Sequence, residues 1–321
     1  MDARPGYNIP LHCHYEMFVL NPDSYLLPVY RISPFRTSDI ELNNKLADSN
    51  TVEDYFKARF KGKAYLYTLN GREAISLALS YYNLQKDDLV TIFTTSGNHY
   101  VSSCVTSEIE KYCRWSRKIE PQTKVILVNH EFGYPFNGIN HLKETGIPII
   151  EDCAHTFFSH DAELTTGTTG DFAIYSFPKM FPLQIGGLLV ANDDFELPLR
   201  SMLKQEEERY MKNVLSYHID RRDELIQKRL LNYGYLAAGF REIGMDERFE
   251  LTKGVVPGVF MFRKGNHRIE LTALKRYFWA HGIQCSVFYG EESFFIPVHQ
   301  SLNKADLEYF IIVMKSFLEK N

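Results

Sequence analysis

The stretch GDFAIYSFPKMFPLQIGGLLVAND, residues 170–193, decides how we interpret the fold of this chain. It holds two apolar runs, at 172–177 and 187–193, each with the length and composition of a β-strand. Because little sequence that could form a helix separates them, we expect one of the two strands to run antiparallel. Between them, Lys179 stands among phenylalanine, proline and methionine residues, directly before two glycines. An amine in such an enclosed loop is expected to have a lowered pKa and to act as a nucleophile.

Strands and helices alternate in the sequence before this stretch. Expected strands are separated by segments whose apolar residues recur at helical spacing, and the strands are predicted at 63–69, 88–94, 124–128 and 147–152. This alternation predicts parallel strands joined by helical crossovers, and therefore an α/β fold. After about residue 195 the sequence becomes charged and helical, and it ends in a shorter alternation of strands and helices. We expect a large domain over residues 1–205, including an N-terminal arm, and a smaller α/β domain over 206–321.

Composition and charge exclude several classes of protein. The 321 residues are 45% hydrophobic and 24% charged, which is typical of a globular protein. A formal net charge of −4 without a long Lys/Arg block argues against nucleic acid or an anionic membrane as the main partner. The five cysteines are widely spaced and form no C-x-x-C pair, which argues against a disulfide framework or a structural zinc site. With no signal-peptide pattern and no apolar run of about 18 residues, we expect a cytoplasmic protein that does not enter a membrane.

Two further segments point to ligand binding at one edge of the sheet. In TLNGREA, residues 68–74, a helix begins at Gly71 directly after a strand, so the free N–H groups of its first turn can bind a phosphate. An ordinary strand-to-helix turn is the alternative. In IIEDCAH, residues 149–155, a buried strand ends at Asp152, at the edge where open α/β sheets bind ligands; a turn or helix cap is the alternative there. An amine, a carboxylate and a phosphate-binding turn are the groups that pyridoxal phosphate requires.

These segments, in this order, resemble the DegT/DnrJ/EryC1/StrS family of pyridoxal-phosphate sugar aminotransferases. The resemblance covers most of the chain and includes VEDYFKARFKGKAYLYTLNGREAISLAL (52–79), VILVNHEFGYP (125–135), IIEDCAHTFFSH (149–160) and the lysine stretch. It implies an aspartate-aminotransferase-like fold (fold type I) and a homodimer. It also implies transfer of an amino group from an amino acid, glutamate, to the keto group of a nucleotide-linked sugar. The amino sugar would serve a surface polysaccharide such as lipopolysaccharide, or a secondary metabolite.

The resemblance also implies roles for individual residues. Lys179 would form a Schiff base with pyridoxal phosphate and move the proton between the substrate carbon and the cofactor. Asp152 would pair with the pyridine nitrogen, and His155 would contact the 3-oxygen of the ring. His130 would line the substrate pocket, with a core or capping histidine as the alternative. The phosphate and the ring face would be held by a further set of residues: Gly71, Arg72, Glu73, Ser176 and Tyr100.

Several features depart from the family pattern and leave alternatives open. Lys179 lies three residues after Ser176, which is a shorter spacing than the common family form, and Arg72 replaces a small residue. No clear Asn-Tyr-Arg segment follows the lysine. A sugar dehydratase on the same fold, or a non-catalytic binding or regulatory homologue, are therefore alternatives. The dehydratases replace the lysine with histidine, so Lys179 argues against the first. The ligand-type residues HCHYE (12–16) have no supporting signal, and we expect no metal site.

Overall fold

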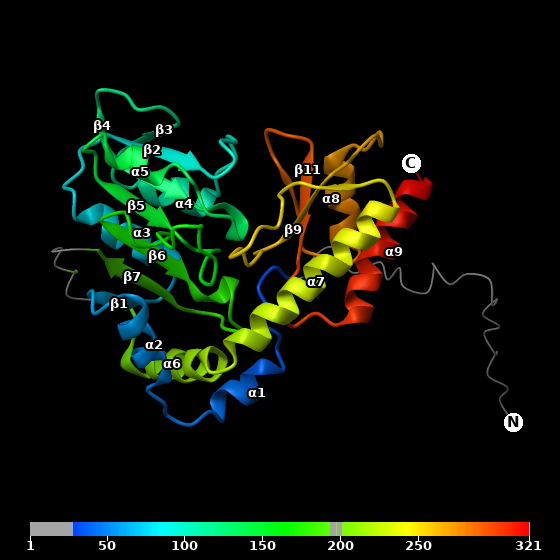
Figure 1. The fold of residues 1–321 in the computed structure, drawn as a ribbon, viewed down its shortest axis with the longest axis horizontal. Helices are drawn as coiled ribbons and strands as arrows, with labels where there is room; N and C mark the ends of the chain where they lie inside the picture. Colours follow the sequence, from blue (N-terminus) through cyan, green and yellow to red (C-terminus); the bar gives the residue numbers. More distant parts are fainter. Residues whose placement is uncertain (1–27, 193–196, 198–200, 321) are drawn as a thin grey trace, which may run out of the picture.

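The computed structural model describes residues 28–192, 197 and 201–320, and these residues form two sheets (Figure 1). The larger sheet has the strand order β1-β7-β6-β5-β4-β2-β3. Its strands are β1 (Tyr65–Thr68), β2 (Leu89–Thr94), β3 (Arg114–Ser116), β4 (Thr123–Asn129), β5 (Ile149–Asp152), β6 (Phe172–Ser176) and β7 (Gly187–Ala191). The segment HCHYE (12–16) lies outside the described residues.

The larger sheet is mostly parallel, as the sequence predicts. Strands β3, β2, β4, β5 and β6 pair in parallel, whereas β7 pairs antiparallel with both β6 and β1. The expectation that one of the two strands around Lys179 runs antiparallel is therefore confirmed. All four residues of the apolar run 125–128 in β4 are fully buried, because helices cover both faces of the sheet.

Each face of the larger sheet has its own core. The helices of this domain are α1 (Asp39–Asn44), α2 (Thr51–Arg59), α3 (Gly71–Ser80), α4 (Ser103–Ile109), α5 (Ile139–Lys143) and α6 (Gln205–Ile219), with 3-10 turns η2 (Glu131–Gly133) and η3 (Phe177–Lys179). Helices α3 and α4 pack on one face, where they meet Phe172 and Ile174 of β6. Helices α2 and α6 pack on the other face, where they meet Ala173 and Tyr175. This alternation along β6 is the period of two that a strand imposes.

The second sheet, with the strand order β10-β11-β9-β8, is antiparallel and belongs to the C-terminal part of the chain. Its elements are β8 (Asp246–Glu247), β9 (Phe260–Arg263), β10 (Ser286–Phe288), β11 (Ser293–Ile296), α7 (Arg222–Glu242), α8 (Leu271–Ala280) and α9 (Lys304–Lys320). One apolar core unites α7, α8 and α9 with this sheet. In Figure 1, α7 runs diagonally from the large sheet to this smaller unit.

The long charged segment after residue 195 contains two helices that belong to different cores. Helix α6 buries Met211 and Val214 in the same cluster as Phe56 of α2. Helix α7 buries Leu236 and Phe240 against the second sheet. The division of the chain at residues 205 and 206 stays a prediction, and the core of the smaller unit begins with α7. None of the described helices has the length and apolar character needed to cross a bilayer.

Candidate active site

A cavity of about 320 Å³ lies at the carboxyl edge of the large sheet. Its lining includes Asn129 at the end of β4, His155 after β5 and Lys179 in η3, and helix α8 contributes Trp279 from the smaller unit. A larger groove of about 650 Å³ follows α7, but it is lined by residues of that helix alone and holds none of the predicted site residues. The ends of parallel strands are where α/β sheets bind ligands, so we take the first cavity as the candidate site.

Lys179 ends the short 3-10 turn η3, directly after β6. The turn is fixed by backbone hydrogen bonds, because Phe177 N–H donates to Gly186 O (3.1 Å) and Met180 N–H donates to Phe177 O (2.9 Å). Burial lowers the pKa of the Lys179 amine, while the Cys104 thiol and the Asp152 carboxylate act in the opposite direction. The lysine is therefore held in a cavity that favours the neutral, nucleophilic amine.

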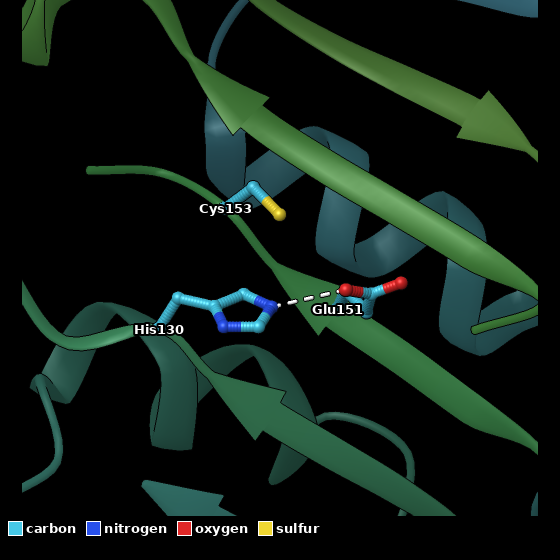
Figure 2. Close-up of side chains that lie close together, drawn as sticks. All are labelled: His130, Glu151 and Cys153. Carbon is cyan, nitrogen blue, oxygen red and sulfur yellow. Dashed lines mark hydrogen bonds and ion pairs between the residues drawn. The ribbon is translucent and has the colours of Figure 1, made fainter. Parts of the chain in front are cut away.

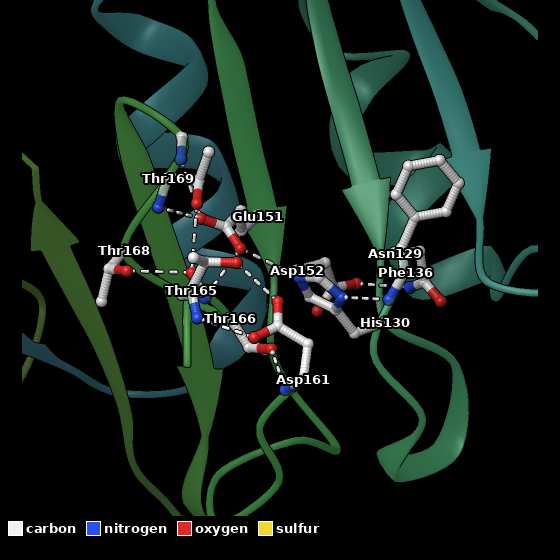
Figure 3. A network of polar contacts seen from close by, with 12 residues as sticks. Asn129, His130, Phe136, Glu151, Asp152, Asp161, Thr165, Thr166, Thr168 and Thr169 are labelled. Atoms are coloured by element: carbon white, nitrogen blue, oxygen red, sulfur yellow. Dashed lines mark hydrogen bonds and ion pairs between the residues drawn. The ribbon is translucent and has the colours of Figure 1, made fainter. Parts of the chain in front are cut away.

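Asp152 is the last residue of β5, and its carboxylate is 3% exposed. Its Oδ2 accepts a hydrogen bond from Asn129 Nδ2 at 2.7 Å, and its Oδ1 accepts one from Ala154 N–H at 3.0 Å; Figure 3 shows Asp152 beside Asn129. Burial raises the pKa of Asp152, and the two donors and the charges of His130 and Lys179 oppose that rise. Strand β5 ends at Asp152 and pairs in parallel with β6, which Lys179 follows, so the predicted acid and amine lie at the same edge of the sheet. Asp152 is not among the residues that line the cavity.

His155 lines the cavity, and one of its buried ring nitrogens, Nδ1, has no hydrogen-bond partner among the described residues. Burial lowers the pKa of His155 well below its ordinary value, and the charges of Lys179 and Arg229 add to this effect. An unpaired polar atom in a buried site requires an explanation. A ligand oxygen at this position, as predicted for the cofactor ring, would supply the missing partner.

The predicted phosphate turn lies beside the serine that was assigned to it. A Cβ atom placed on Gly71 would stand 3.1 Å from Cβ of Ser176, so the first turn of α3 and the end of β6 are in contact. The amide N–H groups of Gly71 and Arg72 donate to no acceptor within residues 28–192, 197 and 201–320. Two backbone donors and one hydroxyl are thus available together for an anion.

Glu73 has a different role from the one predicted. Its N–H group, which was expected to bind the phosphate, donates to Asn70 Oδ1 at 3.1 Å and caps helix α3. Its buried carboxylate accepts from Leu69 N–H at 2.6 Å and from the Ser201 hydroxyl at 3.3 Å. The structure therefore uses Glu73 to fix the turn, and Gly71 and Arg72 carry the free amides.

Tyr100 lies in the cavity wall, within an aromatic group. Its ring stacks on Tyr289 with centroids 6.2 Å apart and an angle of 14° between the planes. It also contacts Phe288 at 5.2 Å and Phe132 at 6.2 Å. The structure places Tyr100 where an aromatic ligand could stack, and its role toward a cofactor ring stays a prediction.

His130 does not line the cavity, although the sequence placed it in the substrate pocket. Its Nε2 lies 3.0 Å from Glu151 Oε2 (Figure 2), and its Nδ1 accepts from Phe136 N–H at 2.9 Å (Figure 3). Burial opposes a charge on this ring, but its contacts with Cys153 and Glu151 raise the pKa of His130 to about 10. Both ring nitrogens are used inside the protein, so the core histidine that we considered as the alternative is the correct interpretation.

Glu151 holds a loop beneath the site. Its Oε1 accepts from the N–H groups of Thr169 and Gly170, both at 2.8 Å, and its Oε2 accepts from Gly167 N–H at 2.7 Å (Figure 3). Possible metal-ligating atoms of Glu151, His130 and Cys153 all lie within 4.8 Å of one another. The hydrogen bonds of Glu151 and His130 account for this grouping without a metal ion.

Arg229 is a buried residue near the site that the sequence did not reveal. Its side chain is fully buried, and its Nη2 donates to the carbonyl oxygen of Lys179 at 3.4 Å and to Gln300 Oε1 at 2.8 Å. Gln300 Nε2 in turn donates to Met180 O at 2.9 Å, and Arg229 Nη1 donates to Pro257 O at 3.2 Å. Burial lowers the pKa of Arg229 to about 9. We call Arg229 and Gln300 the η3 clamp, because they hold the backbone of the lysine turn.

Comparison with known proteins identifies a family whose sequences match this chain. The DegT/DnrJ/EryC1/StrS aminotransferase family matches residues 47–218, which is more than half of the chain. This match contains the phosphate turn, Asp152 and Lys179. The four ordered motifs of the sequence therefore fall inside the matched region.

Two curated proteins are similar to this chain, and both are named GDP-perosamine synthase. The one from Escherichia coli O157:H7 is 29% identical over 169 residues, which cover 48% of this chain and 44% of that protein. The one from Vibrio cholerae is 27% identical over 229 residues, which cover 60% of this chain and 61% of that protein. The chain thus spans less than two thirds of either relative.

The solved structures extend the similarity to the fold of nearly the whole chain. The aminotransferase TlmJ from Streptoalloteichus hindustanus superposes with a TM-score of 0.69 at 17% identity, covering 88% of this chain and 95% of that one. At this identity the likeness concerns the fold alone. It confirms the expected aspartate-aminotransferase-like architecture (fold type I).

Proposed function

This chain belongs to the DegT/DnrJ/EryC1/StrS aminotransferase family, and from that premise we propose that it is a pyridoxal-phosphate transaminase that aminates a nucleotide-linked keto sugar. The observation that carries the proposal is the amine of Lys179, which lines the cavity at the edge of the sheet where β5 ends in the buried Asp152. Because the two curated relatives are named GDP-perosamine synthase, a GDP-linked sugar is the first acceptor to test.

The residues present fit the cofactor of this family. Lys179 supplies an amine of lowered pKa that would bond to the cofactor aldehyde. Asp152 supplies a buried carboxylate for the ring nitrogen, and the unpaired His155 Nδ1 supplies a partner for the 3-oxygen. The amides of Gly71 and Arg72, with the Ser176 hydroxyl beside them, would hold the phosphate. Bound pyridoxal phosphate supplies a ring that accepts electrons from the substrate carbon.

Lys179 would also move the proton in each half reaction. A general acid or base works best when its pKa lies near the working pH. Burial shifts the pKa of Lys179 in that direction, and Asp152 limits the shift. The η3 clamp fixes the backbone from which this side chain projects, so that the amine returns to the same position after each transfer.

The finer parts of the proposal follow the family resemblance. We propose glutamate as the amino donor and a homodimer as the active species, working in the cytoplasm. The amino sugar would serve a surface polysaccharide such as lipopolysaccharide. We further propose the division of the chain into residues 1–205 and 206–321, and the roles given above for Lys179, Asp152, His155, Ser176 and Tyr100.

The test is a pair of half reactions followed by absorbance. Pyridoxal phosphate added to the purified protein should give the visible band of a lysine-bound cofactor, and glutamate should bleach that band to the spectrum of pyridoxamine phosphate. A GDP-linked keto sugar should then restore it. The control variant, Lys253→Met, changes an exposed lysine and should behave as the wild type. A protein that binds the cofactor but whose visible band is not bleached by any amino acid would contradict the proposed transaminase activity.

A further inference from the structure

Glu131 is a buried acid in the wall of the candidate active-site cavity, and one of its carboxylate oxygens has no partner. The side chain is 3% exposed, and it lines the same cavity as Lys179 and His155. Its Oε2 accepts a hydrogen bond from Ser96 N–H at 2.6 Å. Its Oε1 is buried and has no hydrogen-bond partner among residues 28–192, 197 and 201–320. An unsatisfied oxygen of this kind is unfavourable inside a protein unless a ligand or a water completes it.

The backbone around Glu131 is fixed, so this oxygen stays at one place in the cavity wall. Glu131 N–H donates to the Thr95 hydroxyl at 3.0 Å. The next residue, Phe132, has a φ of 51° and its carbonyl accepts from Gly258 N–H at 2.6 Å. Gly133 follows with a φ of 100°, and a Cβ there would lie 2.4 Å from Val256 O. The turn therefore has little freedom to move Glu131 out of the cavity.

Glu131 faces a part of the cavity that is remote from the reacting amine. Burial raises the pKa of Glu131, and Ser96, Arg117 and Arg248 oppose that rise. Glu131 follows β4 and its donor Ser96 follows β2, whereas Lys179 follows β6, and β5 lies between β4 and β6 in the sheet. A ligand that reaches both side chains must therefore extend from the lysine toward the ends of β2 and β4.

We propose that Glu131 Oε1 accepts a hydrogen bond from a ring hydroxyl of the sugar substrate, and that Glu131 is a specificity-determining residue. This inference rests on the proposed function and adds a substrate contact to it. A sugar ring carries hydroxyl donors next to its keto carbon, so it can present one to Glu131 while the keto carbon is at Lys179. An amino-acid donor fits less well, because its nitrogen must reach Lys179 and its carboxylates can only accept hydrogen bonds, so it offers no donor to Glu131 Oε1.

Pairing with Glu131 should make the site selective for sugars that carry the hydroxyl group. A site built to pair with a hydroxyl group rejects an analogue that lacks it, because the buried acceptor is then left unpaired. A hydrogen bond to a charged group corresponds to roughly a tenfold to hundredfold change in affinity. Loss of the Glu131 oxygen should therefore weaken binding of the sugar by at least about tenfold and leave the binding of the nucleotide alone unchanged.

The experiment measures binding rather than turnover. Full-length protein loaded with pyridoxamine phosphate is titrated calorimetrically with GDP-perosamine, which cannot give its amino group to that form, and separately with GDP. The variants are Glu131→Gln, which keeps an acceptor for Ser96 N–H, and Glu131→Leu, which removes both oxygens. Glu250→Gln is the matched control, because Glu250 is exposed on the smaller unit.

The outcomes separate this inference from the proposed function. We expect the two Glu131 variants to lose at least about tenfold in affinity for GDP-perosamine, with leucine the more severe, while GDP binds as in the wild type. Equal losses for both ligands, or no loss for either, would overturn the assignment of Glu131 and leave the proposed function standing. A wild-type protein that binds neither ligand would overturn the GDP-sugar proposal and this inference with it.

Discussion

At the scale of single residues, the site depends on a half-buried lysine and a buried acid. Burial lowers the pKa of Lys179 and raises that of Asp152, so each side chain is driven toward its neutral form. Their mutual attraction opposes both shifts. This balance keeps an amine available as a nucleophile close to a carboxylate that can hold a positively charged ring.

The half-buried Lys179 should make the cofactor-free protein less stable at neutral pH. Its folded pKa is lower than its unfolded value, so the unfolded chain binds more protons between the two values and stability rises with pH in that range. Lys179→Met removes this effect. We expect the variant to be more stable than the wild type at pH 7, with a difference that shrinks as the pH approaches 10.5, the ordinary pKa of a lysine.

Thermal denaturation of the cofactor-free proteins between pH 7 and 10 measures this difference. Lys253→Met is the control, because Lys253 is exposed and its replacement should leave the pH dependence unchanged. A Lys179→Met variant that is less stable than the wild type at pH 7, or a difference that grows with pH, would contradict the burial of the amine.

The sequence allowed part of this site to be predicted residue by residue. Lys179 and Asp152 lie at the same edge of the sheet because strand ends are visible in the sequence and parallel strands end together. Glu73 and His130 differ from the prediction, because their hydrogen bonds to Asn70 and Glu151 depend on side-chain geometry that local sequence does not encode. Glu131 was not predicted either, since an unpaired oxygen is visible only when all neighbours are in place.

At the scale of elements, the buried parallel strands were the easiest to predict. Strand β4 is a continuous apolar run, which indicates a strand covered on both faces. Strand β11 was missed, because the four residues SFFI, three of them apolar, are too few to show a period. The charged segment after residue 195 was expected as long and helical, but α6 ends at Ile219 and α7 begins at Arg222. The interruption between α6 and α7 lets the two helices pack on different cores, α6 on that of the large sheet and α7 on that of the smaller unit.

The η3 clamp should be needed to position the lysine turn. The guanidinium group of Arg229 donates to Lys179 O, Pro257 O and Gln300 Oε1. In Arg229→Lys a single amine replaces it, so at least one of these buried acceptors loses its partner. We expect a loss of about 1–3 kcal/mol in the free energy of unfolding. We also expect a shift in the pH at which the lysine-bound cofactor band titrates, because the geometry of η3 changes.

Chemical denaturation and a pH titration of the visible band measure the two effects. Lys228→Met changes the exposed neighbour of Arg229 on α7 and serves as the control. Loss of stability without any shift of the titration would mean that Arg229 only supports the fold. An Arg229→Lys variant with both properties unchanged would contradict the clamp itself.

At the scale of the whole molecule, the cavity forms where the two units meet. The large sheet supplies Lys179, Asn129 and His155, and the smaller unit supplies Lys275 and Trp279 from α8. Lys179 and His155 were predicted as site residues from the sequence, whereas Asn129 was not. The residues from the smaller unit could not be predicted, because their position depends on how α7 carries one unit onto the other, and a single sequence does not encode that angle locally (Figure 1).

The central claim is that Lys179 holds the cofactor, and the most direct measurement is reductive labelling. The protein loaded with pyridoxal phosphate is reduced with borohydride, digested, and analysed by mass spectrometry. We predict that the phosphopyridoxyl group is found on the peptide containing Lys179, in one copy per chain. A protein that acquires no label, or carries it on another lysine while Lys179 is unmodified, would contradict the account.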